Sequence, residues 1–525
     1  MVPRQASIFG AVLLGLVVLA TTSMAQTKPF MVDEATIGDI HTALKSGAIT
    51  CRQLAQMYLD RIEAYDKKGP ALNAILMINP KVLETADDLD KAFAAKGPVG
   101  PLHCVPVLLK DNFDTADMPT ASGSKALENA VPLADGTVVK KLRQAGALFL
   151  AKTNMQELAQ GGVNVSSLGG QTKNPYDLGR TPGGSSGGTG AGIAANFGTV
   201  GTGSDTVNSI RSPASANNLV GFRPTKGLIS LAGVAPNSWT QDAAGPITRT
   251  VEDNARLLNV MAGYDPADPR TAWNVGQITD YTNALNPSAL KGARIGVLRT
   301  LFGSGSHPEH ALVNAVMEKA LAALKAQGAV LIDIMHPAID SGKIVSELDV
   351  QKWEFKESLN GYLTGFGPNA PVKNLGELIA SGKFHKPALE KFLTAANALE
   401  NPTNDAEYKN RLLRIPDLQQ VVMTLMADQQ LDAFVYPLQK RLPVPIPELD
   451  QAERTGILAS MMGFPAIDVP AGFSPPTATA LLGVPVGIEF LGRPWSEAKL
   501  FSFAYAFEQA TKVRRPPAST PPLTK

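Results

Sequence analysis

Three residues of this sequence offer acid–base chemistry that needs no histidine: Lys110, Ser185 and Ser209. Lys110 follows a short apolar run, and both serines lie on backbone rich in glycine, which exposes N–H groups. Burial disfavours an ammonium and lowers the pKa of a lysine toward neutrality, so a buried lysine can accept a proton from a hydroxyl. Taken singly, each residue fits a simpler interpretation better: a solvated lysine, a linker serine and a helix-capping serine.

Histidine is the usual general base, but here it gives a weaker pattern. His307 and His310 are the one close pair, and a metal between them would need a third ligand that the sequence does not supply. We therefore expect both to be helix-start residues that face water. The run 184–188 (GSSGG) fits the G-x-S-x-G elbow, but it lacks the preceding strand and a suitable downstream histidine.

The elements that must position these residues alternate between helices and apolar strands. Residues 36–65 predict two helices broken at Gly47-Ala48, with Thr50 as a cap, and further helices are expected at 86–96, 137–144, 311–327 and 497–512. Apolar runs predict strands at 105–109, 147–151, 291–298, 330–334, 432–436, 466–470 and 486–491. This alternation favours an α/β protein with a largely covered sheet.

Two stretches depart from that alternation. Residues 161–203 are so rich in glycine that most of the stretch cannot be a core helix or strand, and it must pass close to other backbone or to a ligand. Residues 343–430 are mainly helical in pattern and are expected to be an insertion over the core. The aromatic residues of this insertion fit either a cover for an acyl site or a helix core: Trp353, Phe355, Tyr362 and Phe366.

The composition excludes several classes of protein. Among 525 residues, 48 lysines and arginines balance 47 aspartates and glutamates, which leaves no electrostatic footprint for nucleic acid or an anionic membrane. With 44% hydrophobic and 18% charged residues, the chain can bury enough surface to fold. Its length suggests three or four domains of about 150 residues, although one large α/β domain fits as well.

The first 25 residues have the layout of a secretory signal peptide. Arg4 precedes an apolar run from Ile8 to Ala20, and Ser23-Met24-Ala25 is a small-x-small cleavage site. The run is shorter than the ~20 residues that span a bilayer, although an uncleaved anchor is the alternative. We therefore expect an exported protein, periplasmic or secreted, whose mature chain starts near Gln26.

The two cysteines of the sequence are Cys51 and Cys104. Export permits a disulfide, but one possible pair is no disulfide scaffold, and two unpaired core thiols are the favoured interpretation. Neither cysteine has a neighbour at the spacing of a zinc site, so no metal and no cofactor are expected.

Several motifs appear in order along the chain: 101–112 (PLHCVPVLLKDN), 152–157 (KTNMQE), 174–188 (from NP to PGGSSGG), 203–211 (GSDTVNSIR), 221–225 (GFRPT), 242–246 (DAAGP) and 463–466 (GFPA). Together they resemble the amidase signature family of Ser-Ser-Lys hydrolases, over residues 34 to 515. The resemblance implies one α/β/α domain over 26–525, built around a mixed, mostly covered sheet.

The same resemblance implies roles for individual residues. Ser209 corresponds to the nucleophile, Ser185 to a relay that follows a cis peptide, and Lys110 to the base. The oxyanion would be bound by the backbone N–H groups of Thr206, Val207, Asn208 and Ser209. Substrate-facing backbone falls at 159–162, with Gly161 as a substrate-binding residue, while Asp205 and Arg211 would fix the nucleophile loop.

The chain departs from the family pattern at two places. Many members have Gly-Gly before the nucleophile, where this chain has Val207-Asn208. A β-branched residue adopts positive φ only at a cost, so we predict a negative φ for Val207. The second departure is Cys104, where many members have glycine.

The function expected from these observations is hydrolysis of a carboxylic amide through a serine acyl-enzyme, with a small-molecule amide as substrate and no nucleic acid partner. Three alternatives stay open at this stage. They are an esterase of the same mechanism, an A-type subunit of an amidotransferase, and a catalytically silent binding protein on the same scaffold.

Overall fold

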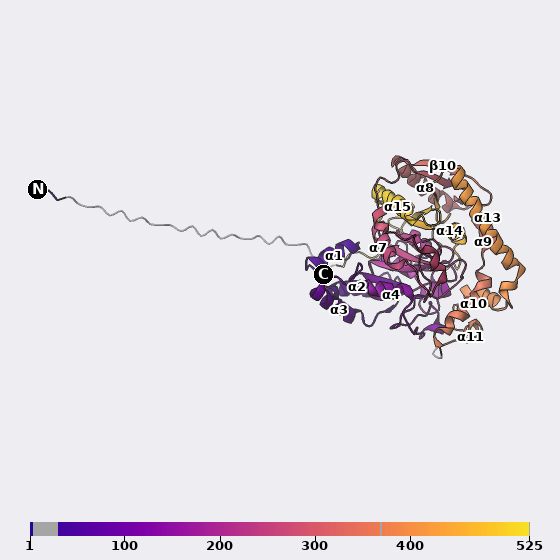
Figure 1. Ribbon diagram of the computed structural model, residues 1–525, viewed down its shortest axis with the longest axis horizontal. Helices are drawn as coiled ribbons and strands as arrows, with labels where there is room; N and C mark the ends of the chain where they lie inside the picture. The colour runs from indigo at the N-terminus through magenta and orange to yellow at the C-terminus, as the bar shows by residue number, and fades with distance from the viewer. Residues whose placement is uncertain (4–29, 368–369, 524–525) are drawn as a thin grey trace.

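The structure is a computed structural model that describes residues 1–3, 30–367 and 370–523 (Figure 1). Almost all of the expected signal peptide, from Arg4 to Ala25, lies outside the described residues. Among the described residues, no helix combines the length and the apolar character that crossing a membrane requires.

One mixed sheet of eleven strands forms the centre of the described chain, in the order β1-β3-β2-β6-β8-β7-β12-β13-β11-β9-β10. The strands are β1 (Ile75–Ile78), β2 (Pro106–Lys110), β3 (Leu148–Thr153), β6 (Val200–Asp205), β7 (Val220–Arg223), β8 (Ala243–Thr248), β9 (Arg294–Leu298), β10 (Val330–Ile334), β11 (Ala433–Pro437), β12 (Ala466–Phe473) and β13 (Pro485–Leu491). Strands β3, β2 and β6 are parallel neighbours, as are β11, β9 and β10, whereas the strands between these groups pair antiparallel. Two short strands, β4 (Val165–Ser166) and β5 (Gly170–Gln171), form a separate hairpin.

Helices cover both faces of this sheet. Alternate residues of each strand point to opposite sides, so a single strand contributes side chains to the core on both faces. On β2, Val107 and Leu109 join one core cluster and Leu108 joins another. The first cluster includes α4 (Thr137–Gln144), α7 (Val251–Met261), α8 (Pro308–Ala326) and α15 (Glu497–Thr511). The second includes α1 (Ile37–Lys45), α2 (Cys51–Tyr65), α3 (Val82–Lys96), α5 (Gly187–Ala194) and α6 (Arg211–Ala216). The predicted α/β/α arrangement is therefore confirmed.

The glycine-rich stretch 161–203 is mostly irregular, but it contains the buried helix α5. Glycine lets this helix lie directly on other backbone: a Cβ atom on Gly188 would come within 2.1 Å of the carbonyl oxygen of Asn154. A Cβ atom on Gly184 would lie 2.9 Å from the carbonyl carbon of Gly162. The predicted close approach of backbone to backbone is confirmed, and it brings the turn at 183–186 against the sheet.

The orange helices of Figure 1 lie together along one side of the molecule and belong to the segment between β10 and β11. They are α9 (Ser341–Leu348), α10 (Gln351–Thr364), α11 (Leu375–Ser381), α12 (Lys386–Asn397) and α13 (Ala406–Asp428); α14 (Ile457–Met462) follows β11. Phe355 and Phe366 pack within the helix core formed with α11 and α12. A buried carboxylate on α10, Glu354, accepts hydrogen bonds from Ser238 Oγ (2.5 Å) and Tyr408 OH (2.9 Å), which ties these helices to the loop that precedes β8.

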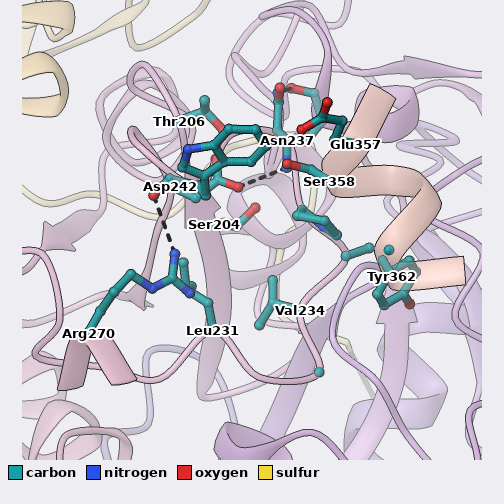
Figure 2. Close-up of a pocket in the computed structure, with 16 residues that line it drawn as sticks. Ser204, Thr206, Leu231, Val234, Asn237, Asp242, Arg270, Glu357, Ser358 and Tyr362 are labelled. Atoms are coloured by element: carbon teal, nitrogen blue, oxygen red, sulfur yellow. Dashed lines mark hydrogen bonds between the residues drawn. The ribbon is translucent and has the colours of Figure 1, made fainter. Parts of the chain in front are cut away.

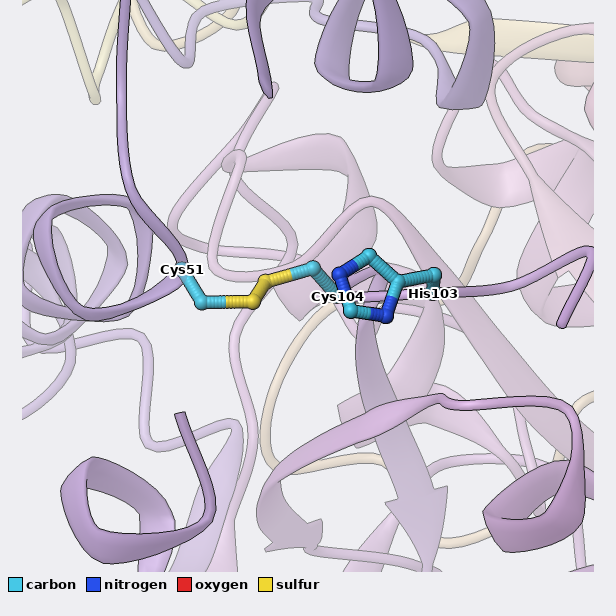
Figure 3. Close-up of side chains that lie close together, drawn as sticks. All are labelled: Cys51, His103 and Cys104. Carbon is cyan, nitrogen blue, oxygen red and sulfur yellow. A yellow bond between two sulfur atoms is a disulfide. The ribbon is translucent and has the colours of Figure 1, made fainter. Parts of the chain in front are cut away.

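Cys51 and Cys104 form a disulfide, so the prediction of two unpaired thiols is wrong (Figure 3). The start of α2 lies beside the turn before β2, which places the two Cα atoms 5.7 Å apart, a normal separation for a disulfide. Cys104 has a φ of 64°, a conformation that glycine adopts at no cost, which accounts for the glycine that many relatives of this motif carry there.

His103 completes a cluster with the two cysteines, and all three residues are buried (Figure 3). Three such side chains are a reasonable metal-binding set when the sulfurs are thiolates. In this structure the two sulfur atoms are bonded to each other, so neither is the thiolate that a metal would require.

Candidate active site

Lys110 is the last residue of β2 and is fully buried. Its Nζ lies 2.8 Å from Ser185 Oγ, 2.8 Å from Ser204 Oγ and 3.3 Å from the carbonyl oxygen of Ser204. A neutral amine has two N–H donors and one lone pair. It can therefore donate both N–H groups to the two oxygens of Ser204 and accept the hydroxyl hydrogen of Ser185, which satisfies every polar group of the uncharged side chain.

Burial lowers the pKa of Lys110 to about 7, against the opposing attraction of Asp205 and Asp242. Neither carboxylate contacts the amine directly, so desolvation is the dominant effect. At neutral pH a large fraction of Lys110 is therefore uncharged, which is the state a general base requires.

Ser185 lies in the turn just before α5 and is fully buried. The Gly184–Ser185 peptide bond is cis, as the family resemblance implied. The carbonyl of Ser185 accepts a hydrogen bond from Gln156 N at 3.0 Å, and the next residue, Ser186, donates its N–H to the carbonyl of Ser209 at 3.2 Å. This backbone contact places the two serine segments side by side, although the hydroxyls of Ser185 and Ser209 share no hydrogen bond.

The loop between β6 and α6 presents unused donors. None of the N–H groups from Thr206 to Ser209 donates a hydrogen bond to another described residue. The carbonyl of Thr206 accepts from Gln241 Nε2 (3.3 Å) and that of Val207 from Arg211 Nη2 (2.8 Å). In a trans peptide the carbonyl and the following N–H point in opposite directions, so the next two N–H groups point away from these partners and are available to an anion.

A buried ion network holds this loop in place. Arg211 contacts Asp205 at 3.1 Å and Glu489 at 2.5 Å, and Arg223 contacts Asp205 at 2.9 Å. Burial alone would raise the pKa of Asp205, but the two guanidinium groups hold it below its usual value. The predicted fixing role of Asp205 and Arg211 fits these contacts. Val207 has a negative φ, as predicted.

A cavity of about 460 Å³ opens at Ser209. Its wall includes the predicted substrate-facing backbone at Ala159, Gln160 and Gly161, together with Thr206 and Val207. The remaining lining comes from the orange helices and the loop after β11: Gln351, Ala388, Lys391, Phe392, Leu449, Asp450 and Arg454.

A second cavity of about 350 Å³ meets the first at Ala159 and Thr206. Figure 2 shows Ser204 at its inner wall, with Arg270 and Tyr362 on opposite sides. Leu231, Val234 and Trp239 make much of its lining apolar. Of the four aromatic residues singled out in the helical segment, Tyr362 is the one that lines this cavity.

Ser204 is a site residue that sequence reasoning missed. It lies within the GSD motif, but nothing in the motif indicates that its hydroxyl contacts Lys110. The signal that could have found it is the strand pairing: β2 and β6 are parallel neighbours, and alternate residues of β6, Thr202 and Ser204, both hydrogen-bond Lys110. Asn112 Nδ2 also donates to Ser204 Oγ, at 3.0 Å.

The expectation for the two histidines is half wrong. His307 caps α8 by accepting the N–H of Glu309 at 3.2 Å, and it is partly exposed. His310 does not face water: it is fully buried, and its Nε2 lies 3.0 Å from a carboxylate oxygen of Glu453. The loop after β11 folds over the start of α8, which the local sequence pattern does not reveal.

Comparison with known proteins agrees with this geometry. A family model described as Amidase matches residues 53–501. A probable amidase of Arabidopsis thaliana is 36% identical over 516 residues, covering 93% of this chain and 92% of the relative. The A-type subunit of the glutamyl-tRNA(Gln) amidotransferase of Geobacter sp. (strain M21) is 34% identical over 498 residues, covering 91% of this chain and 98% of the relative.

Among solved structures, the peptide amidase of Stenotrophomonas maltophilia is 35% identical and superposes with a TM-score of 0.81, covering 92% of this chain and 98% of that one. These matches confirm the resemblance seen in the motifs and the fold that it implied. The chain belongs to the amidase family and is an amide-hydrolysing enzyme.

Proposed function

We propose that Ser209 is the nucleophile of this hydrolysis, Ser185 the proton relay and Lys110 the general base. The observation that supports this assignment best is the 2.8 Å contact between Lys110 Nζ and Ser185 Oγ in a fully buried setting, where no carboxylate contacts the amine. The neutral amine can accept the Ser185 proton while Ser185 Oγ accepts the proton of Ser209.

In the first half-reaction Ser209 Oγ attacks the amide carbonyl carbon, and the resulting oxyanion binds to the free N–H groups of residues 206–209. One such donor is typically worth ~10²–10³ in rate. The C–N bond then breaks, and the proton held by Lys110 returns through Ser185 to the leaving amine. In the second half, water attacks the acyl-serine through the same relay, which releases the carboxylic acid and restores Ser209.

The hydroxyls of Ser185 and Ser209 share no hydrogen bond in the structure, which fits a site without bound substrate. Catalytic hydrogen bonds are often long or poorly aligned before substrate binds. Rotation of one serine side chain between staggered conformations is enough to move an Oγ atom. We propose that this contact forms when the carbonyl enters the oxyanion site.

Covalent labelling with a fluorophosphonate tests the assignment. The wild-type enzyme should be labelled at Ser209, and Ser209→Ala should not be labelled at all. Ser186→Ala is the matched control, because it removes a neighbouring hydroxyl while leaving Lys110, Ser185 and Ser209 in place. Labelling of the Ser209→Ala protein would remove Ser209 as nucleophile.

We also propose that the chain acts alone on a small-molecule amide and does not donate ammonia to a partner, although its relatives include the A-type subunit of an amidotransferase. The signal-peptide layout of residues 1–25 supports this, because the amidotransferase reaction uses a cytosolic tRNA. The purified protein should hydrolyse amides without a partner protein. Parallel assays on matched amides and esters would show whether esters are better substrates.

We further propose that the enzyme is exported, periplasmic or secreted. The layout of residues 1–25 supports this, and so does the Cys51–Cys104 disulfide, since disulfides persist mainly in oxidising compartments. N-terminal sequencing of the mature protein should find a start near Gln26. A retained Met1 in the membrane fraction would indicate an uncleaved anchor instead.

A further inference from the structure

Arg454 is an unusual cation beside the proposed nucleophile. It lines the same cavity as Ser209, and a Cβ atom on Gly162, the neighbour of the substrate-facing Gly161, would lie 3.5 Å from its Nη1. Its side chain is 25% exposed, yet its guanidinium donates no hydrogen bond to any described residue. Among the described residues, Asp450 is the carboxylate within ion-pair distance of it, at 4.0 Å.

Two fully buried arginines of the described chain are much better satisfied. Arg211 donates to Asp205, Glu489 and two backbone carbonyls, and Arg223 donates to Asp205 and to the carbonyl of Gln241. A guanidinium has five N–H donors arranged as a fork that matches a carboxylate. Those of Arg454 are left for whatever occupies the cavity.

The charges around this cavity do not cancel. Lys391 also lines it and makes no ion pair or hydrogen bond with a described residue. Against these two cations stands Asp450, whose side chain is 79% exposed. Asp349 is near enough to Arg454 to sense its charge, but it does not line the cavity, and both of its oxygens accept hydrogen bonds from Gln351. The cavity therefore favours an anion next to the scissile bond.

We propose that the enzyme selects amides that carry a carboxylate near the scissile bond, recognised by Arg454 with help from Lys391. This inference rests on the proposed function, because it takes the Ser209 cavity to be the substrate site. The carboxylate would receive two parallel N–H donors from Arg454, an arrangement that fixes orientation as well as charge. The apolar second cavity then accepts the uncharged side of the substrate.

Two pairs of isosteric amides test the proposal. In the first, the carboxylate is on the acyl side: N-phenylsuccinamic acid against neutral 4-methylpentananilide. In the second, it is on the amine side: N-benzoylglycine against neutral N-isobutylbenzamide. In one of the pairs the anionic amide should have a kcat/KM about 10- to 100-fold above its neutral partner, the range expected for hydrogen bonds to a charged group.

Variants locate the recognition. Arg454→Gln should lower the anionic-to-neutral ratio about 10-fold or more, and Arg454→Lys should restore part of it, because charge returns without the fork. Lys391→Gln should lower the ratio only about twofold, as expected for an exposed charge. Asp450→Asn should raise it, since a competing carboxylate is removed. Arg256→Gln, which removes a charge on α7 outside both cavities, is the matched control.

Rates are normalised to fluorophosphonate-labelled sites, so a variant that folds poorly is not mistaken for one that fails to recognise the anion. A wild-type enzyme that is labelled and hydrolyses the neutral amides, but shows no preference in either pair, would overturn this inference and leave the proposed function intact. A preference that survives in Arg454→Gln would overturn the role of Arg454. Absence of both labelling and hydrolysis would overturn the proposed function, and this inference with it.

Discussion

Two lysines on neighbouring strands of the sheet are equally buried, yet their surroundings differ. Lys110 ends β2 and contacts the hydroxyls of Ser185 and Ser204 at 2.8 Å and, at 3.3 Å, the carbonyl oxygen of Ser204. Lys152 lies on β3, and its Nζ contacts the carbonyl oxygen of Phe113 at 2.6 Å and the hydroxyls of Thr120 (3.0 Å) and Thr115 (3.4 Å), with Asp111 at 4.0 Å. Burial lowers the pKa of both amines.

The difference lies in which atoms surround each amine. A carbonyl or carboxylate oxygen only accepts, and the hydroxyls of Thr120 and Thr115 donate their own hydrogens to backbone carbonyls. The partners of Lys152 therefore favour an amine that donates and keeps its charge. The hydroxyl of Ser185 donates to no other described residue, so it can give its hydrogen to Lys110 and take it back. The comparison teaches that burial alone does not make a lysine a base; the reversibility of its hydrogen bonds matters as well.

The largest effect is expected from the paired variants Lys110→Met and Lys152→Met. Loss of the base should lower kcat/KM by about 10²–10⁴ in Lys110→Met, with the fold retained. Lys152→Met should instead lower the free energy of unfolding by about 3 kcal/mol, because it leaves buried acceptors unpaired, while the molecules that fold keep their activity. Denaturant titration and assays per labelled site separate the two outcomes. Full activity in Lys110→Met would show that Lys110 is not the base, and the contrast with Lys152 would then have no functional meaning.

The pH profile is the next test. Protonated Lys110 cannot accept a proton, so activity should be lost as the pH falls through its pKa of about 7. Below that value kcat/KM should fall about tenfold per pH unit, and it should reach a plateau above it. The rate of fluorophosphonate labelling should follow the same curve, since it reports the same nucleophile. Activity that rises on acidification would contradict a base role for Lys110.

Ser204→Ala sharpens the comparison, because it removes one of the two hydroxyls that contact Lys110. We expect a fall of about tenfold in kcat/KM. The acid limb should also move to lower pH, since an ammonium loses more from a missing acceptor than a neutral amine does. Ser204→Thr keeps the hydroxyl and should recover both properties. An unchanged pH profile in Ser204→Ala would show that Ser204 packs against Lys110 without affecting its pKa.

The smallest effect on activity is expected from the disulfide, which lies six residues before Lys110. The double variant Cys51→Ser/Cys104→Ser should lower the free energy of unfolding by about 2–4 kcal/mol, as is usual for loss of a native disulfide. Its activity at moderate temperature should stay near that of the wild type, because β2 is held by its neighbours in the sheet. A large loss of activity without a loss of stability would show that the disulfide helps to position Lys110.

Much of the fold could be predicted from local patterns. The helix Thr137–Gln144 and the strand Val330–Ile334 have the bounds that apolar spacing indicated, and Thr50 caps α2 through a capping box. Such features depend on neighbours within a few residues, whose side chains and capping groups are visible in the sequence. Strand ends were less accurate: β12 runs to Phe473, three residues past the expected end, because pairing with β13 extends it.

The sequence by itself determined the family and the alternation of helices and strands, and it singled out Lys110, Ser185 and Ser209 as candidates, because motifs and periodicity are local properties. Tertiary structure alone decided that Cys51 forms a disulfide with Cys104 and that Ser204 forms a hydrogen bond with Lys110. It also decided that His310 is buried against Glu453 and that Arg454 lines the cavity that opens at Ser209. The physical reason is distance along the chain. These contacts join residues from 53 to more than 200 positions apart, and they form only once the sheet order and the loops packed over it have brought those residues together.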